Sequence, residues 1–407
     1  MADNQDEGTR VFYAQALYGR EEIDAVVEIL ETQAIILMTG PSVTKFEARV
    51  AALFGKQHGL MVNSGSSANM LAVAVLGLNA GDEVVTPALT FSTTVAPLIQ
   101  HGLVPAFVDV EADTCNIDVD LVEDVIGPKT KAMMIPNLIG NLPEWAVLRE
   151  IADRHGLKVI EDSADTIGSL YRGKPTGSLS DIATTSFYAS HVVTAGGFGG
   201  AVCFDDPEME RQARLLRGWG RSSSVMGESE AVEDRFNFNI DGIDYDTKFV
   251  FEAPGYNFLP SEMSAAFGLV QLDRLEEYAA RRVRNFEALK GFFQDYEEWF
   301  ILPRQTNETY TPWLAVPLIV RDDAPFNRRE LQIYFEENGV QTRTVFTGNI
   351  LRQPGFEDVP HRTHPGGYPN ADQVMRGGFL LGCHQGMGTE EIAYIAEIFE
   401  KFVKHRQ

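Results

Sequence analysis

Short apolar runs alternate with segments of helical character through the first part of the chain. The apolar runs are typical of buried strands, and they are Gly59–Val62, Glu83–Thr86, Val104–Val110, Ala132–Pro136 and Lys158–Glu161. The helical segments are Glu21–Thr32, Val43–Phe54, Ala68–Leu78, Ser92–His101, Asp118–Ile126 and Trp145–His155. This alternation predicts an α/β fold with a mostly parallel central sheet that is covered by helices on both faces.

A glycine-rich stretch, Ser186–Gly200, interrupts this alternation. We expect a buried strand at Thr184–Tyr188, then His191, then the small residues of Thr194–Gly200, and a second strand from Ala201. Glycine-rich backbone packs no core of its own, and it occurs where a chain turns sharply or approaches a ligand. A titratable group between buried strands and such a turn is a candidate site residue. His191 is that group, and its unperturbed pKa of about 6.5 suits a general base.

The pattern changes after residue 220. Ser222–Asp244 is polar and acidic without a clear period, which indicates a long surface loop or a lid. A long helical stretch, Ser261–Leu289, follows Pro260, and a smaller α+β region comes after it. We therefore predict a large domain at residues 1–270, including the N-terminal segment, and a small C-terminal domain at residues 271–407. Its elements are a strand at Leu314–Val320 and helices at Arg328–Asn338 and Glu390–Lys404.

Composition narrows the function classes. The chain has 407 residues and a formal net charge of −24, which disfavours binding to nucleic acid or to an anionic membrane surface. Its three cysteines are far apart, which argues against disulfides or a cysteine-ligated metal, and we expect no metal site. No apolar run is long enough to span a bilayer, and the first residues lack signal-peptide features, so we expect a cytoplasmic protein.

Three further segments carry candidate site residues, and each has a purely structural alternative. Asn63–Asn69 (NSGSSAN) joins a strand to a helix, where backbone amides and hydroxyls bind phosphate or serine simply caps the helix. Phe91 follows a strand and is either a stacking aromatic or a core residue. Asp162 ends a buried strand, where open α/β sheets build their sites, or it caps the next helix.

These motifs together resemble the DegT/DnrJ/StrS sugar aminotransferases, which are pyridoxal-phosphate enzymes of the aspartate-aminotransferase fold type I. In that family the pattern Ser-Phe-x-x-x-Lys precedes a run of small residues, and Ser186, Phe187 and Gly199-Gly200 match it. The lysine position holds His191, which cannot form an imine with the cofactor aldehyde but can move a proton.

The resemblance implies a role for each matching residue. The cofactor phosphate would be bound by Gly65, Ser66, Ser67 and Ser186. Phe91 would stack on the pyridine ring, and Asp162 would pair with the ring nitrogen. Asn257, in PGYNFLPSEM, would reach the phosphate in a neighbouring subunit, or else it belongs to a turn after Pro254-Gly255. We therefore expect a homodimer with shared active sites.

One branch of the family is favoured. TRTVFTGNILRQP, from Thr342 to Pro354, resembles a segment of the nucleotide-sugar 3-dehydratases, as do LIGNL and Trp219-Gly220-Arg221. Asn349 and Arg352 are candidate substrate-binding residues, although a turn with an exposed arginine also fits. The resemblance implies an enzyme that uses pyridoxamine phosphate to remove the C3 hydroxyl of a nucleotide-linked 4-keto-6-deoxyhexose, with His191 taking a proton from the cofactor's aminomethyl carbon. Glutamate would regenerate the cofactor.

Some relatives in this branch use an iron–sulfur cluster instead of glutamate. A cluster needs about four thiolates, and this chain has three scattered cysteines. We therefore expect no iron–sulfur cluster. Two other functions stay open. The chain could be a nucleotide-sugar aminotransferase in which Lys174 or Lys248 forms the imine, although both lie in polar stretches. It could also be a noncatalytic homologue that binds pyridoxal phosphate.

Overall fold

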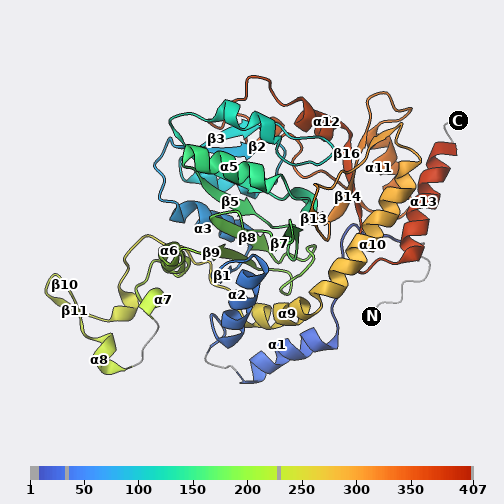
Figure 1. Ribbon diagram of the computed structural model, residues 1–407. Helices are drawn as coiled ribbons and strands as arrows, with labels where there is room; N and C mark the ends of the chain where they lie inside the picture. Colours follow the sequence, from blue (N-terminus) through green and yellow to red (C-terminus); the bar gives the residue numbers. More distant parts are fainter. Residues whose placement is uncertain (1–8, 33–35, 227–230, 405–407) are drawn as a thin grey trace.

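The computed structural model describes residues 9–32, 36–226 and 231–404, and its largest element is a seven-stranded sheet (Figure 1). Its strands, in spatial order, are β1 (His58–Val62), β9 (Gly200–Phe204), β8 (Ile182–Ser186), β5 (Lys158–Asp162), β4 (Thr130–Pro136), β2 (Glu83–Pro87) and β3 (Val104–Val108). Strand β9 is antiparallel to both of its neighbours, and the four remaining pairs are parallel. The predicted mostly parallel sheet is confirmed.

Both faces of this sheet are buried under helices. Neighbouring residues of strand β5 point to opposite faces: Ile160 belongs to the apolar core on one face of the sheet, and Val159 belongs to the core on the other face. The first face is covered by α3 (Gly65–Val75), α4 (Ser92–Gln100) and α6 (Pro207–Arg217). The second is covered by α5 (Trp145–His155), α2 (Pro41–Leu53) and α9 (Glu262–Asp273), with α1 (Arg20–Thr32) packed on α9.

A second, antiparallel sheet lies beside the first. Its strands are β12 (Phe300–Ile301), β14 (Ala315–Val320), β16 (Gly378–Gly382) and β15 (Thr342–Thr344), in that order. The helices around it are α10 (Leu275–Gln294), α11 (Arg328–Glu337), α12 (Pro369–Gly377) and α13 (Thr389–Lys404). The N-terminal segment joins this core, because Val11 is buried there and pairs with Val340. The domain division at residues 270 and 271 stays a prediction.

Three sequence-based element predictions were wrong in detail. The strand expected at Thr184–Tyr188 ends at Ser186, where the chain turns into the glycine-rich loop. The helix expected at Asp118–Ile126 is a pair of single 3-10 turns, η1 (Val119–Leu121) and η2 (Glu123–Val125). The long helix expected from Ser261 is two helices, α9 and α10, which meet at Arg274.

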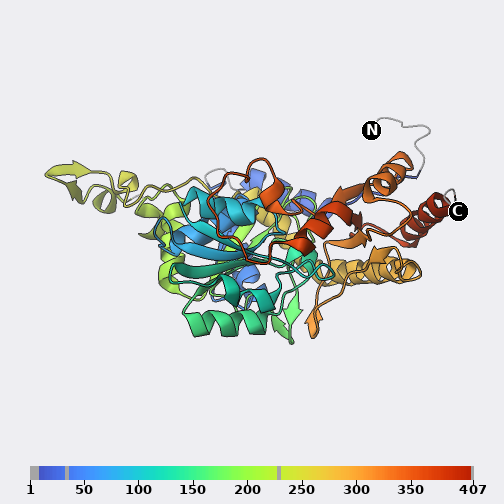
Figure 2. The same cartoon turned by 90° about the horizontal axis from the view of Figure 1, so that it is seen from above.

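Residues 222–226 and 231–251 form an arm that extends away from the body of the chain, as both ribbon views show (Figures 1 and 2). It contains α7 (Ser223–Met226), α8 (Val232–Arg235), the hairpin of β10 (Phe238–Ile240) and β11 (Ile243–Tyr245), and the turn η4 (Thr247–Phe249). Part of the predicted loop or lid, residues 227–230, lies outside the described residues. The hairpin and α8, within the rest of that segment, point away from the central sheet in both views (Figures 1 and 2). None of the described helices is both long and apolar enough to cross a lipid bilayer.

A short three-stranded sheet completes the fold. It consists of β6 (Leu170–Tyr171), β7 (Lys174–Pro175) and β13 (Thr309–Tyr310). Strand β13 belongs to the segment that leads into β14, so this small sheet links the two larger ones. The connection matters for the site, which lies where the two larger sheets meet.

Candidate active site

A cavity of about 650 Å³ opens between the two sheets at the carboxyl ends of the parallel strands. Open α/β sheets place their ligands at this edge. From the first sheet and its loops, the lining includes Gly65, Ser66, Phe91, Asp162, Asp165, Ser186 and His191. From the N-terminal segment and the second sheet, it includes Tyr13, Leu314, Arg343, Phe346, Gln353 and Leu380. Both sheets therefore contribute to one site.

The loop after β8 holds His191 in a fixed place. Val192 and Val193 are buried in the core directly after it. The Thr194 hydroxyl donates to the Phe187 carbonyl at 3.1 Å and accepts from the Gly197 amide at 3.0 Å. Gly196, Gly197 and Gly199 all have positive φ angles, which glycine adopts without strain. The glycine run thus lets the chain double back while the histidine stays at the cavity wall.

The His191 ring has one nitrogen bonded to the protein and one directed at the cavity. Nδ1 lies 3.0 Å from the Ser186 carbonyl, which can only accept, so Nδ1 carries the proton in the neutral ring. Nε2 therefore holds the free lone pair, and it lies 3.8 Å from Asp165 Oδ1. Burial lowers the pKa of His191 to about 4, against the hydrogen bond to Ser186, which raises it. The ring is a neutral base at pH 7.

Two buried carboxyl groups face the same cavity in different environments. Asp162 Oδ2 accepts from Asn69 Nδ2 and from the Thr94 hydroxyl, both at 2.8 Å, and Oδ1 accepts from the Ala164 amide at 3.2 Å. Burial raises the pKa of Asp162, and these three donors oppose that rise. Asp165 has fewer donors: burial, followed by the charge of Asp162, raises the pKa of Asp165 to about 7. Asp162 is therefore better suited to remain ionised, and Asp165 is better suited to carry a proton.

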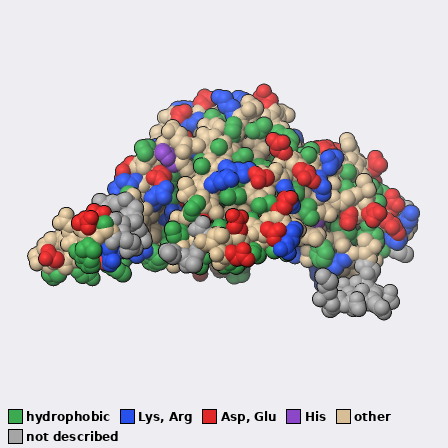
Figure 3. Space-filling model, turned by 90° about the horizontal axis from the view of Figure 1, so that it is seen from below, with side chains coloured by type: hydrophobic (Ala, Val, Ile, Leu, Met, Phe, Trp, Pro, Cys, Tyr) green, Lys and Arg blue, Asp and Glu red, His purple; other side chains and the backbone are tan. Residues whose placement is uncertain are grey.

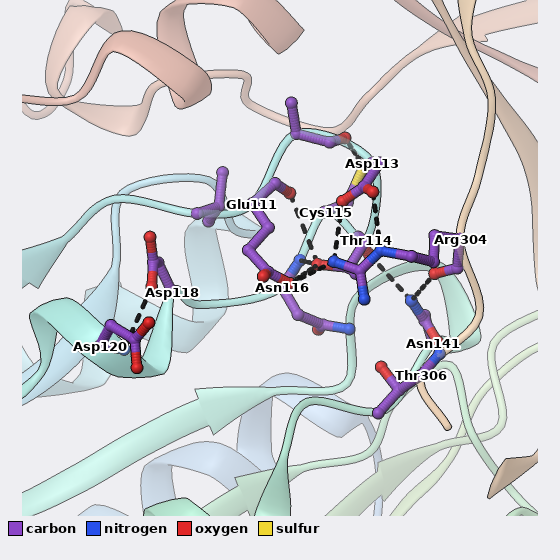
Figure 4. Close-up of polar contacts among 12 residues, drawn as sticks. Glu111, Asp113, Thr114, Cys115, Asn116, Asp118, Asp120, Asn141, Arg304 and Thr306 are labelled. Carbon is purple, nitrogen blue, oxygen red and sulfur yellow. Dashed lines mark hydrogen bonds and ion pairs between the residues drawn. The ribbon is translucent and has the colours of Figure 1, made fainter. Parts of the chain in front are cut away.

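The turn at residues 138–141, whose backbone donates to Asp165, is anchored by a polar cluster around Asn141 (Figure 4). Asp165 Oδ2 accepts from the Ile139 amide at 3.0 Å, and Ile139 has a positive φ of 60°. The Asn141 side chain fixes this turn by donating to the carbonyls of Thr114 and Arg304 at 3.1 and 3.0 Å. LIGNL, singled out in the sequence, thus positions a carboxyl group at the cavity wall.

Replacing Asp165 by asparagine should change how stability depends on pH in the cofactor-free protein. Asp165 keeps its proton to about pH 7 when folded, against an ordinary pKa of 3.8, so its contribution to stability falls as pH rises through this window. His191 has the opposite effect, which is gained between about pH 4 and 6.5. Asp165→Asn removes only the first effect, so we expect the variant to gain up to about 4 kcal/mol relative to the parent between pH 4 and 8.

Denaturant unfolding at several pH values measures this difference. Asp181→Asn is the control. Burial alone would raise the pKa of Asp181, but the Val159 amide, Arg149 and Lys158 together lower it, so its substitution should give the opposite trend. An unchanged pH dependence in Asp165→Asn would show that Asp165 is ionised in the folded protein.

The first turn of α3 approaches the end of β8 closely. A Cβ atom on Gly65 would lie 2.6 Å from the Ser186 Cβ, so only glycine allows this contact. Ser64 caps the helix by accepting from the Ser67 amide at 3.1 Å. The early amides of a helix have no carbonyl partner within it, which makes this turn suitable for an anion. Gly65, Ser66 and Ser186 line the cavity here.

Four of the predicted site residues do not line the cavity of their own chain. The Ser67 hydroxyl is buried and donates to Asn63 Oδ1 at 2.6 Å. Asn257 is exposed near the base of the arm, where it pairs with Gly218. Asn349 donates to Asp372 at 2.8 Å, and Arg352 forms an ion pair with the same carboxylate. Phe91 does line the cavity, half exposed, with its ring edge-on to Phe346.

Sequence reasoning missed several residues that the structure brings to the cavity. Asn69 lies four residues after Gly65 and Thr94 three residues after Phe91, so helical spacing from the motifs could have identified them. Arg343 lies in the TRTVFTGNILRQP segment, but the two other residues of that segment were chosen. Tyr13 gave no signal, because Gln341, to which its backbone amide donates, lies 328 positions later in the chain.

The comparison with known proteins identifies the family. Residues 17–400 match the DegT/DnrJ/EryC1/StrS aminotransferase family. The chain belongs to this family. It is 38% identical over 377 residues to lipopolysaccharide biosynthesis protein RfbH of Salmonella typhimurium, with 90% of this chain and 86% of that protein covered. It is 34% identical over 394 residues to dTDP-4-dehydro-2,6-dideoxy-D-glucose 3-dehydratase of Saccharopolyspora spinosa, with 94% and 85% covered.

Solved structures agree with this assignment. The structure of GDP-4-keto-6-deoxymannose-3-dehydratase with a trapped PLP–glutamate geminal diamine superposes with a TM-score of 0.86 at 28% identity, and covers 95% of this chain and 99% of that one. The family and the expected fold type I architecture are therefore confirmed. The family consists of PLP-dependent enzymes that modify sugars, and some of its members are aminotransferases.

The residues present fit a pyridoxal-type cofactor. Asp162 is buried with three hydrogen-bond donors, and no lysine or arginine of the described chain forms an ion pair with it. A protonated ring nitrogen placed beside such a buried carboxylate would offset its negative charge. The close contact of Gly65 and Ser186 leaves helix amides and a serine facing the cavity, which suits the cofactor phosphate.

Proposed function

We propose that the protein is a 3-dehydratase that removes the C3 hydroxyl of a nucleotide-linked 4-keto-6-deoxyhexose with pyridoxamine phosphate as cofactor. The observation that carries this proposal is the His191 ring, whose Nδ1 is held by Ser186 and whose Nε2 faces the cavity. It stands where the resembling aminotransferases have their lysine. Relatives named as 3-dehydratases support the proposal from outside the chain.

The chain's own residues would bind and orient the cofactor, and His191 would move the proton. The cofactor, when bound, supplies an amine for the keto group and a ring that accepts electrons. Asp162 would hold the ring nitrogen, Phe91 would stack on the ring, and Gly65 and Ser66 with Ser186 would hold the phosphate. His191 Nε2 would accept the proton whose loss starts the elimination, and return it to the departing C3 oxygen.

The residues that line the cavity also argue against an imine between a lysine and the cofactor. Among the described residues that line it there is no lysine. Lys174 lines a different, smaller pocket with Trp145, and Lys248 lies in the arm. A permanent covalent bond to the cofactor would need one of these to reach the cavity, so we favour a cofactor that is held without one and regenerated by glutamate. We also propose that no iron–sulfur cluster takes part, because the three cysteines are buried at separate positions.

The deciding experiment incubates the protein with pyridoxamine phosphate and a panel of nucleotide-linked 4-keto-6-deoxyhexoses. Mass spectrometry should show loss of one water from one of them, and glutamate should sustain further turnovers. Formation of a stable amino sugar would instead identify an aminotransferase. No change in any sugar, with bound cofactor unaffected by glutamate, would leave a noncatalytic cofactor-binding protein.

We further propose that the active protein is a homodimer. The arm carries eight large apolar side chains that are at least 40% exposed, and green hydrophobic atoms stand on its surface in Figure 3. They are Val232, Phe236, Phe238, Ile240, Ile243, Tyr245, Phe249 and Phe251. Monomeric proteins rarely expose such a set, and a second copy of the chain would bury it. Asn257, at the base of the arm, would then face the partner's site.

Polar substitution of the arm tests the dimer. Phe236→Ser, Ile243→Ser and Phe249→Ser together remove exposed apolar area without disturbing the core, so each chain should still fold. We expect the dissociation constant of the dimer to rise at least about a hundredfold and turnover to fall with it. Sedimentation velocity over a concentration series measures this. Val147→Ser, at an exposed position on α5, is the control. A parent protein that sediments as a monomer would contradict the proposal.

A further inference from the structure

The cavity carries little positive charge for the reactants that the proposed function requires. Nucleotide sugars and glutamate are anions, and the chain has a formal net charge of −24. The cavity itself presents two carboxyl groups, Asp162 and Asp165. An anion therefore enters against the overall charge unless a local cation offsets it. Among the described lining residues, Arg343 is the only arginine or lysine.

The position and contacts of Arg343 suit it to bind an anion in the cavity. It lies on β15, where it is paired with Leu380, another lining residue. Its guanidinium stands 5.5 Å from the centroid of the Tyr13 ring, and Nη1 donates to the Thr342 carbonyl at 2.7 Å. These contacts restrict the side chain but use few of its five donors, and none of them neutralises its charge.

Arg343 has no carboxylate partner within ion-pair distance among the described residues, unlike Arg352 and Arg362. Arg352 is paired with Asp372, and Arg362 with Glu83. An exposed guanidinium with unused donors at a cavity wall can form charge-assisted hydrogen bonds with an anion. Tyr13 supports the side chain from the N-terminal segment, since its own backbone amide donates to Gln341 at 3.0 Å.

Arg343 stands at the mouth of the cavity. It also lines an open depression beside α11, together with two further arginines, Arg328 and Arg329, and two carboxylates, Glu336 and Glu337. A reactant that enters the cavity from this side passes the guanidinium. The planar fork of arginine matches both a carboxylate and a phosphate with two parallel hydrogen bonds.

We propose that Arg343 is a specificity-determining residue that binds the anionic group of a reactant, either a carboxylate of the amino donor or the diphosphate of the nucleotide sugar. This inference rests on the proposed function for the identity of the reactants. The two sources share one chemistry, which is a bidentate anion at the guanidinium. They are distinguished by the probe whose binding weakens when the guanidinium is removed.

The test compares Arg343→Gln, Arg343→Lys and the parent protein by calorimetric titration. The probes are glutarate, which has two carboxylates and no amine, and the nucleoside diphosphates GDP, CDP and dTDP. We expect Arg343→Gln to weaken one class of probe about tenfold to a hundredfold, as for other charge-assisted hydrogen bonds, and Arg343→Lys to weaken it less. Arg376→Gln, which removes an exposed arginine of α12 that is paired with Asp322, should change the binding of neither class of probe.

Each outcome has a defined meaning. Weaker glutarate binding would show that Arg343 binds the amino donor, and weaker nucleotide binding would show that it binds the nucleotide sugar. Weaker binding of both would show that the two anions use the same site. Unchanged affinities in Arg343→Gln, or a parent that binds no probe, would overturn the inference. Thermal unfolding of each variant verifies that the fold is kept. Because binding is measured without turnover, a parent that binds the probes but dehydrates no sugar would refute the proposed function and leave Arg343 as an anion-binding residue.

Discussion

Replacing His191 by asparagine should lower the rate of dehydration by about two to four orders of magnitude, the usual contribution of a general base. Asparagine can still donate to the Ser186 carbonyl, so the loop keeps its anchor, but no basic nitrogen faces the cavity. The measurement is kcat at saturating sugar and cofactor, with cofactor binding measured separately. His155→Asn is the matched control, because His155 lies on the surface, bonded to Glu123 at 2.7 Å.

The pH dependence sharpens this prediction. Since the pKa of His191 is lowered to about 4, the ring stays neutral as pH falls from 8 to about 5, and the base should remain competent over that range. His191→Lys should lose dehydration too, and borohydride should then trap the cofactor on the protein, seen as an increase in mass. Near-parental turnover in His191→Asn, or a trapped adduct in the parent, would contradict the assigned role.

Hydrophobic pattern predicted the elements of the first sheet well, because each strand is buried on both faces and each helix on one. Periodicity failed where burial continues beyond an element. Phe187 is fully buried, so the run Thr184–Tyr188 looked like a strand, although the backbone leaves the ladder at Ser186. Similarly, α9 and α10 read as one helix because the break at Arg274 involves no proline or glycine. Tertiary packing, which the local pattern does not contain, sets both ends.

The candidate site was predictable where motif residues end parallel strands or begin the following helices. Asp162 and Ser186 end neighbouring strands, so fold topology alone brings them to one edge. Residues of the second sheet follow no such rule. Asn349 and Arg352 come from a segment that reaches the cavity, yet their side chains bind Asp372, while Arg343 lines the cavity from the same segment. The sequence predicted which segment reaches the cavity. Which of its residues lines the cavity depends on the direction of the side chains, and packing fixes that direction.

Asp162→Asn should weaken the binding of pyridoxal phosphate about tenfold to a hundredfold and lower turnover by at least about two orders of magnitude. The substitution keeps the size of the side chain but removes the charge that would hold the ring nitrogen protonated. It also places an amide where Asn69, Thr94 and the Ala164 amide now donate to two carboxylate oxygens. The measurements are the cofactor dissociation constant by absorbance and kcat with saturating cofactor.

Asp109→Asn separates this effect from a loss of stability. Asp109 is also a buried carboxylate just after a strand of the same sheet, and it accepts from the amides of Asn370 and Ala371, both at 2.9 Å. It does not line the cavity, so its substitution should lower the melting temperature without changing cofactor affinity once the protein is folded. If the two variants lose cofactor affinity equally, Asp162 acts through folding. If Asp162→Asn alone loses affinity, a carboxylate at the end of β5 provides the negative charge that the cofactor ring requires, and the electron-accepting power of the site depends on it.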